Sequence, residues 1–313
     1  MTIRFWGVRG SHPRPLLPHE VQSKIASVVQ RIRPGDLESA ETREKFLANL
    51  PPWLFGTTGG NTPCVELRLG DDTMIVFDGG SGIQALSAAL QKERRNVREF
   101  HIFFTHFHYD HVQGLPFFVP AYDPSVKVRF YSPLPELEDN LKQQMKHPYF
   151  PITMDEKMSN LEFVTLDGSP LHFGDAELTF RELNHPGRAF GYRIHERGRT
   201  FVHATDIELT ESDFEKTPEN TRFFQGADVM ILDTQYTLGE AIEKYNWGHS
   251  SFSLGVDFAT AWNVKNLYLF HHEPLYNDKK LFKNLQSARW YANRLGNHKT
   301  QIYLSREGTE VEV

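Results

Sequence analysis

The segment HIFFTHFHYDH at 101–111 constrains this chain more than any other part of the sequence. Its apolar first half is typical of a buried strand, which leads directly into a polar loop. Four potential metal ligands lie within six positions of that loop: His106, His108, Asp110 and His111. In extended backbone, residues two apart point to the same side, so His106 and His108 face together. Because imidazole and carboxylate are donors for Zn, Mn or Fe, the segment predicts a metal site at a strand end.

Further potential ligands follow other predicted strands. His185 comes after the strand 176–183, Asp206 ends the strand 199–205, and His271 and His272 follow the strand 266–270. A lone histidine at a strand end is more often a hydrogen-bonded surface residue than a ligand. Three such ends, all with suitable donor atoms, favour a site assembled from distant parts of the chain. The pattern leaves open whether His271 or His272 is the metal ligand.

Composition narrows the donor set and the class of partner. Among 313 residues there is one cysteine, Cys64, so a thiolate cluster and an intrachain disulfide are excluded. Lys and Arg number 34 against 40 Asp and Glu, and a net charge of −6 argues against binding nucleic acid through backbone electrostatics. No stretch approaches the ~20 apolar residues of a membrane span, and the first residues lack a signal-peptide pattern. We therefore expect a cytoplasmic protein with no membrane partner.

Strand and helix patterns alternate along the chain without a fixed repeat or a linker. We predict one α+β domain over 1–313, built from two mixed β-sheets flanked by helices. Amphipathic patterns at 20–32 and 39–50 interrupt the strand-rich sequence and predict a helical insertion at about 16–58. This insertion could be a lid, a dimer surface or a peripheral decoration. The segment 301–313 is expected to form one closing strand after a helix at 279–295.

The HxHxDH pattern at 106–111, together with the later Asp and His residues, resembles the metallo-β-lactamase-fold hydrolases. The resemblance implies an αββα sandwich with a dinuclear metal centre at one edge of the sheets. It assigns one metal to His106, His108 and His185, and the other to Asp110, His111 and His271. Asp206 would bridge the two metals. Asp78, at the end of the strand 73–78, would orient the ligands, although an aspartate there could simply cap the following GGSG turn.

Three segments resemble the phosphodiesterase branch of that fold, which includes ribonuclease Z and cyclic-nucleotide phosphodiesterases: FWGVRGSHPRP at 5–15, GGNTPCVEL at 59–67, and the stretch from WGHSS to FHHEP at 247–274. In that branch the histidine of the GHS segment, here His249, acts as a proton donor near the leaving oxygen. His249 could alternatively cap the following helix, but its spacing of 22 residues from His271 favours the catalytic role. The resemblance thus implies catalytic roles for His249, Asp110 and Asp78.

One departure from the branch bears on the substrate. Ribonuclease Z forms carry a long basic arm between the ligands that correspond to His185 and Asp206, whereas here 20 residues intervene, enough for a hairpin. We therefore expect no tRNA clamp and a small phosphodiester substrate such as a 3′,5′-cyclic nucleotide. The expected cofactors are two divalent metal ions, Zn first and Mn or Fe as alternatives, which would activate a bridging hydroxide for attack. The resemblance also implies a homodimer.

Other functions remain open. Another hydrolase of the same fold, such as a lactonase, thioesterase or lactamase, would carry similar ligands. A non-catalytic nucleotide or metal sensor would keep the ligands without turnover. Four residues next to the motifs are candidates for phosphate or base contacts: Trp6, Arg9, Arg188 and Trp247.

Overall fold

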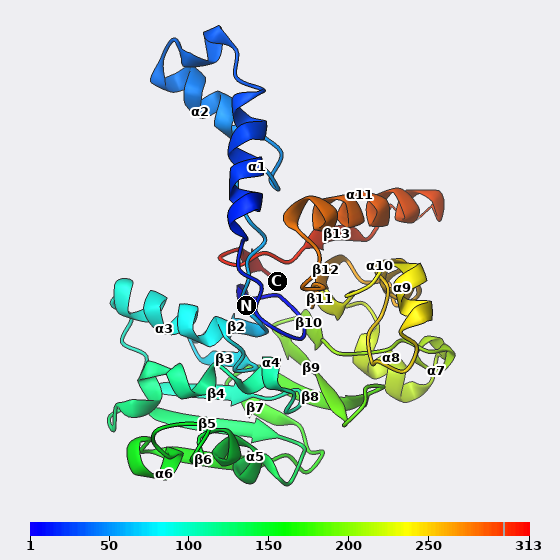
Figure 1. Cartoon of the computed structure of the whole chain (residues 1–313). Helices are drawn as coiled ribbons and strands as arrows, with labels where there is room; N and C mark the ends of the chain where they lie inside the picture. The colour runs from blue at the N-terminus through cyan, green and yellow to red at the C-terminus, as the bar shows by residue number, and fades with distance from the viewer. Residues whose placement is uncertain (297) are drawn as a thin grey trace.

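The computed structural model describes residues 1–296 and 298–313, and their strands form two seven-stranded mixed sheets (Figure 1). The first sheet has the order β14 (Glu310–Glu312), β1 (Thr2–Gly7), β2 (Cys64–Arg68), β3 (Met74–Phe77), β4 (Glu99–Phe103), β5 (Lys127–Ser132) and β6 (Leu161–Thr165). The second has the order β13 (Gln301–Leu304), β12 (Asn266–Phe270), β11 (Val229–Asp233), β10 (Arg199–Ala204), β9 (Ala189–Glu196), β8 (Ala176–Leu183) and β7 (Leu171–Phe173).

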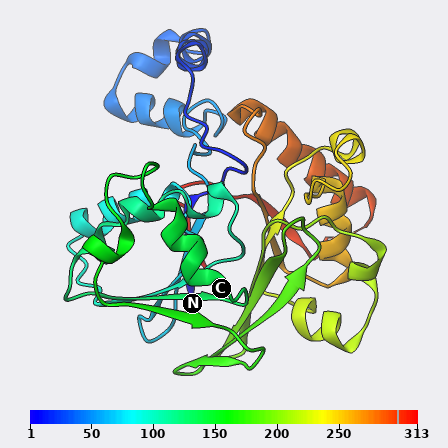
Figure 2. The same ribbon diagram turned by 60° about the horizontal axis from the view of Figure 1, so that its bottom comes forward.

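Helices cover the outer faces of the two sheets, while the inner faces pack on each other (Figures 1 and 2). The helices near the first sheet are α3 (Gly82–Lys92), α4 (Tyr109–Val112), η2 (Leu115–Phe117), η3 (Val119–Tyr122), α5 (Leu137–Gln144) and α6 (Met154–Lys157). Those near the second are α7 (Glu211–Phe214), α8 (Pro218–Phe224), α9 (Leu238–Glu243), α10 (Phe252–Ala261) and α11 (Asp278–Arg294). The predicted α+β sandwich is confirmed.

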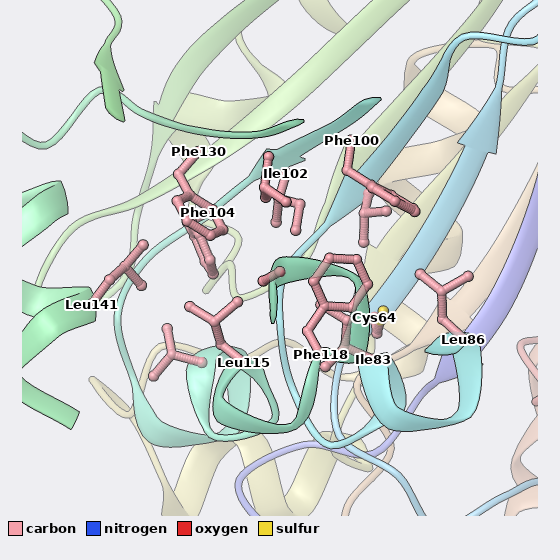
Figure 3. Packing of buried hydrophobic residues seen from close by; sticks show 14 of the residues in the cluster. Cys64, Ile83, Leu86, Phe100, Ile102, Phe104, Leu115, Phe118, Phe130 and Leu141 are labelled. Carbon is pink, nitrogen blue, oxygen red and sulfur yellow. The ribbon is translucent and has the colours of Figure 1, made fainter. Parts of the chain in front are cut away.

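Burial on both faces explains the apolar run at 102–104, at the end of β4. Phe100 and Ile102 point to the outer face, where they pack with Phe118 and other residues of the helical layer (Figure 3). Phe103 points to the inner face between the sheets, where its ring stacks on Tyr131 at 4.3 Å between centroids. A strand covered on both faces needs apolar side chains at successive positions. The loop 105–111 therefore begins from a strand that is packed on both sides.

The helical insertion projects from the body as an arm (Figure 1). It contains α1 (Pro18–Val29), η1 (Pro34–Leu37) and α2 (Ala40–Ala48), and none of these elements has a buried residue. Two ionic contacts hold α1 at its base: Glu20 pairs with Arg14, and Lys24 pairs with the buried Asp278. We call residues 16–58 the arm.

The expected single closing strand at 301–313 is wrong. Residues 301–304 form β13 in the second sheet, whereas residues 310–312 form β14 in the first. A turn at Gly308, which adopts a φ of 76°, separates the two strands. The chain end therefore links the sheets, because each half extends the edge of a different sheet. Among the described residues, no helix is long and apolar enough to span a bilayer.

Candidate metal centre

The parallel strands of both sheets end at one edge of the sandwich, and the sequence-predicted residues gather there. Asp78 follows β3, the loop 105–111 follows β4, and Asp206 and His271 follow β10 and β12. Asp78, Asp206 and His271 adopt φ values of 64°, 56° and 58°, in the left-handed region that non-glycine residues seldom adopt. Such backbone persists only where the surrounding structure enforces it, and it is concentrated at functional sites.

Two groups of three donors match the two triads implied by the resemblance. In the first, the donor atoms of His106, His108 and His185 all lie within 4.8 Å of one another. In the second, those of Asp110, His111 and His271 do the same. This is the spacing of side chains that share a cation, and it joins residues up to 161 positions apart in the sequence.

Asp206 lies between the two triads and offers one carboxylate oxygen to each. Its Oδ2 is 3.7 Å from Nε2 of His106 and 3.8 Å from Nε2 of His185. Its Oδ1 is 3.3 Å from Nε2 of His111 and 3.4 Å from Nε2 of His271. The structure thus brings together all seven residues that the resemblance assigns to metal binding.

Hydrogen bonds orient the imidazoles of the cluster. Nδ1 of His111 donates to Asp78 at 2.9 Å, Nδ1 of His185 donates to the carbonyl of Gly248 at 2.8 Å, and Nδ1 of His271 donates to the amide oxygen of Gln235 at 2.9 Å. An imidazole that donates from Nδ1 presents the lone pair of Nε2 as a ligand, and such partners raise metal affinity.

These observations fit a divalent metal centre. The Nε2 atoms of His106 and His111 are buried and have no hydrogen-bond partner among the described residues. Burial holds the pKa of His106 well below its usual value, so its lone pair is available. Three buried carboxylates, Asp78, Asp110 and Asp206, overcome burial and raise the pKa of His111. Buried negative charge of this kind requires a compensating cation.

Asp78 lies behind the cluster rather than in it. It is fully buried, and its carboxylate accepts from the backbone N–H of Thr105 at 2.8 Å as well as from His111. Burial raises the pKa of Asp78, although His111 and Thr105 oppose the shift. These contacts connect the end of β3 to the loop after β4. They differ from a cap of the GGSG turn, since Asp78 contacts the histidine loop instead.

His271 and His272 both follow β12, but their side chains contact different parts of the structure. Nε2 of His271 lies 3.2 Å from Oδ2 of Asp110, inside the cluster. Nε2 of His272 lies 2.9 Å from the carbonyl oxygen of Ser305, and burial lowers the pKa of His272 to about 3. His271 therefore faces the cluster, and His272 joins β12 to the segment after β13.

His249 lies beside the cluster and is not one of the two triads. Its Nδ1 donates to Oδ2 of Asp233 at 2.7 Å, and its ring stacks on that of His271 with centroids 4.8 Å apart. Burial opposes protonation, but the charge and hydrogen bond of Asp233 outweigh it and raise the pKa of His249 to about 9. The imidazole is therefore suited to carry a proton at neutral pH.

A cavity of about 400 Å³ opens over the cluster. It is lined by Ser11, Phe107, His108, Tyr109, Asp110, Asp206, His249 and His271. Tyr109 is 80% exposed and stands at its rim. The backbone of two glycines packs directly against ligand imidazoles, where no side chain would fit. A Cβ on Gly10 would lie 2.4 Å from Nδ1 of His271, and one on Gly248 would lie 2.1 Å from Nδ1 of His185.

Trp6 and Arg9 are two of the four candidates for phosphate or base contacts, and the structure contradicts both. Trp6 is buried, and its indole donates to Glu66. Arg9 is 1% exposed and donates to the carbonyls of Gly59, Glu273 and Tyr276. Both side chains have a structural role in the first residues of the chain. Arg188 and Trp247 are on the surface, where Arg188 pairs with Glu182 and Trp247 is 62% exposed.

The sequence analysis missed Asp233, Gln235 and Ser11. Asp233 is fully buried at the end of β11, between the strands that precede Asp206 and His271. The strand-end argument applied to Asp206 would also have found it. Ser11 donates its backbone N–H to Oδ2 of Asp110 at 2.7 Å, a contact across 99 positions that no local pattern indicates.

Comparison with known proteins agrees with this architecture. A family model described as a β-lactamase superfamily domain matches residues 73–272. Ribonuclease Z of Picrophilus torridus is 23% identical over 300 residues, which cover 82% of this chain and 91% of that protein. The metallo-β-lactamase-fold protein YhfI of Bacillus subtilis superposes with a TM-score of 0.63 at 16% identity, covering 100% of this chain and 98% of that one. The short form of human tRNase Z superposes with a TM-score of 0.61 at 17% identity, covering 100% and 99%. The chain therefore belongs to the β-lactamase superfamily and is a ribonuclease Z-like, metal-dependent hydrolase with the metallo-β-lactamase fold.

Proposed function

We propose that this hydrolase is a dinuclear phosphodiesterase that cleaves small phosphodiesters, with 3′,5′-cyclic nucleotides as the first candidate substrates. One observation carries the proposal: His249, hydrogen-bonded through Nδ1 to the buried Asp233 at 2.7 Å, lines the same cavity as members of both donor triads. Asp233 also raises the pKa of this imidazole to about 9, although desolvation opposes the shift. Hydrolysis of a phosphodiester requires a proton donor for the departing alkoxide, and a metal cluster with such a donor beside it meets that need.

The proposed ligands are those brought together at the strand ends. His106, His108 and His185 would hold one divalent cation, Asp110, His111 and His271 would hold the other, and Asp206 would contact both. When loaded, such a centre supplies neutralisation of phosphoryl oxygens and a lowered pKa for water. Zn, Mn and Fe all suit this donor set, and Zn is the expected metal.

The chain's own residues then orient the reaction. Nδ1 of His249 donates to Asp233, which leaves the Nε2 proton on the other edge of the ring for the leaving sugar oxygen. The backbone N–H of Ser11 holds Asp110 in position. Phe107 and Tyr109 form an aromatic part of the cavity wall, where a nucleobase can stack. A 3′,5′-cyclic nucleotide would yield a nucleoside monophosphate.

The decisive experiment compares two leaving groups in His249→Ala. With Zn or Mn, kcat for cyclic nucleotides should fall by about 10²–10⁴, because the alkoxide loses its proton donor. Turnover of bis(p-nitrophenyl) phosphate should fall far less, since p-nitrophenolate leaves without a proton. His172→Ala, an exposed histidine on β7, is the matched control. Equal losses on both substrates would remove His249 from this role, and activity that survives His106→Ala with Asp110→Ala would discard the metal mechanism.

A second candidate is cleavage of RNA, such as a tRNA, favoured by the similarity to ribonuclease Z over 82% of the chain. Two features favour the smaller substrate: the segment between His185 and Asp206 is the short hairpin of β9 and β10, and the net charge is −6. A panel of cyclic nucleotides, a precursor tRNA, nitrocefin, a lactone and a thioester separates these activities. Cleavage of the RNA without turnover of cyclic nucleotides would reverse our choice.

We also propose that the chain acts as a single domain, with the arm as an insertion, and that it works in the cytoplasm as a homodimer. Light scattering after size exclusion tests the oligomeric state, since one chain has a mass of 36.2 kDa. A single species of that mass at micromolar concentration would contradict the dimer.

A further inference from the structure

A second cavity, remote from the metal cluster, lies between the base of the arm and the C-terminal part of the second sheet. It has a volume of about 290 Å³, and none of its lining residues lines the cavity over the cluster. We call it the arm cavity. Its wall comes from the arm segment at 52–58, from α11, and from the strands β12 and β13.

One side of the arm cavity is aromatic. Tyr268 and Tyr303 are paired across β12 and β13, and their rings stack with centroids 5.0 Å apart and planes at 18°. Trp53, from the arm, and Phe282, from α11, contribute two more rings to the lining. Rings from the arm, α11, β12 and β13 form a wall suited to a flat, aromatic ligand group.

The same cavity contains positive charge that the protein leaves uncompensated. Arg289 uses its Nε to donate to the carbonyl of Ile302, at 2.9 Å, and its guanidinium lies 6.0 Å from the ring centroid of Tyr303. Neither Arg289 nor Arg306 forms an ion pair with any residue that the structure describes, although both line the cavity. Guanidinium groups recognise phosphates and carboxylates through paired hydrogen bonds.

The carboxylate in this lining is already engaged. Oδ2 of Asp278 pairs with Lys24, and Oδ1 accepts from the backbone N–H of Thr58 at 2.8 Å. Burial would raise the pKa of Asp278, but Lys24 and Thr58 hold it below its usual value. The free charge of the arm cavity is therefore positive.

We infer that the arm cavity is a binding site for a small aromatic anion, of which a nucleoside monophosphate is the member we select. Its base would pack against the rings of Trp53, Tyr268 and Tyr303, and its phosphate would meet Arg289 and Arg306. A volume near 300 Å³ is at the small end for ligand sites, so it suits one mononucleotide rather than a longer chain. Selecting a nucleotide among aromatic anions rests on the proposed function, because that reaction releases one.

Contacts connect this site to the metal cluster. Asp278 is 3.9 Å from Arg9, and Nη1 of Arg9 donates to the carbonyl of Tyr276 at 2.8 Å. Tyr276 belongs to the loop that begins at His271. A ligand between the arm and α11 would stabilise the elements on both sides of that loop.

The test is binding of adenosine 5′-monophosphate to the full chain. Titration calorimetry measures the affinity, and tryptophan fluorescence reports binding near Trp53. We expect a saturable fluorescence change that is lost in Trp53→Phe. Affinity should fall on the order of tenfold or more in Arg306→Ala and again in Arg289→Ala/Arg306→Ala, since each removes a charge-assisted hydrogen bond. Arg294→Ala is the matched control, because Arg294 lies on α11 and contacts Trp290 instead of the cavity. Melting curves check that each variant is folded.

Each outcome decides the inference separately from the proposed function. Asp110→Asn, which disables the catalytic edge, should retain the Trp53-dependent signal. Adenosine and inorganic phosphate alone should each bind more weakly than the nucleotide, because each engages one part of the site. Affinity unchanged in the double arginine variant, or a signal that disappears in Asp110→Asn but not in Trp53→Phe, would overturn the site. Nucleotide binding without any phosphodiesterase activity would retain the site and remove only its identification with a product.

Discussion

Individual side chains at the catalytic edge have separable tasks, because His111, His185 and His271 each have one nitrogen facing the cluster and the other facing a supporting partner. Asp78 supports His111, Gln235 supports His271, and the carbonyl of Gly248 supports His185. His249 differs in that it lies outside both triads itself, and its supporting partner is the carboxylate of Asp233. The first three contacts predict effects on metal affinity, and the fourth predicts an effect on proton transfer.

Substitution of Gln235 tests whether the hydrogen bond to His271 contributes to metal affinity. Its amide oxygen accepts from Nδ1 of His271, while its amide nitrogen donates to Glu273 at 2.8 Å. Gln235→Leu removes the acceptor, and metal affinity should fall by about 10–100-fold with the fold retained. Chelator competition measures this without any assay of activity. Gln235→Glu keeps an acceptor for His271 and should retain more affinity than Gln235→Leu; equal losses in both variants would show that the contact does not orient His271.

The pH dependence of turnover tests His249. The protonated form is the donor, and its pKa is raised to about 9, so activity should decline only as the pH rises through that region. Asp233→Asn removes the charge that raises the pKa. The alkaline limb of the kcat profile should then move to lower pH, with kcat reduced even at the new optimum. An alkaline limb that stays in place in Asp233→Asn would contradict the assignment.

At the scale of elements, ion pairs join the helix α1 of the arm to the body. This helix has no buried residue and is held through Glu20 and Lys24. Arg14, the partner of Glu20, also donates to the carbonyl of Pro274 at 2.9 Å, so the pair joins the arm to the loop after His271. An element with so few buried contacts opens more readily than the sheets.

Acid should loosen the arm before it unfolds the body. Hydrogen bonds from Arg14 lower the pKa of Glu20 from 4.5 to about 2. Since the folded pKa is the lower one, this pair stabilises the arm above pH 4.5, and its contribution is lost as the pH falls toward 2. Glu20→Gln mimics the acid form at pH 7 and should raise amide exchange in α1 by up to about fivefold. Glu41→Gln, an exposed glutamate of α2, is the control, and equal exchange in both variants would exclude this attachment.

For the whole molecule, the cluster joins segments from both sheets, so its occupancy should affect global stability. Carboxylates of Asp110 and Asp206 are buried among imidazoles, and a divalent cation that binds only the folded state stabilises it by mass action.

Removal of metal should therefore lower the melting temperature. We expect a chelator to reduce it by several degrees, with recovery on adding Zn or Mn, since ~1 kcal/mol shifts a large domain by about 2–4 °C. Asp206→Asn should reduce this response by removing the charge shared by the triads. Calorimetry with and without chelator measures both effects. A melting temperature that is indifferent to metal in the unmodified chain would contradict the proposed centre.

Local sequence patterns were sufficient to predict the two-sheet fold and most of the residues that meet at its edge. Apolar runs that end in His or Asp predicted the sheets and the residues at their shared edge, because parallel strands bring their carboxyl ends together. The same patterns could not choose between His271 and His272, separate β13 from β14, or find Ser11 and Gln235. Those outcomes depend on contacts between segments far apart in the chain, where side-chain direction and the neighbouring strand decide which atoms meet. The arm cavity is of this second kind, since Trp53 lies more than 200 positions from the other rings and the arginines, and no short motif contains them.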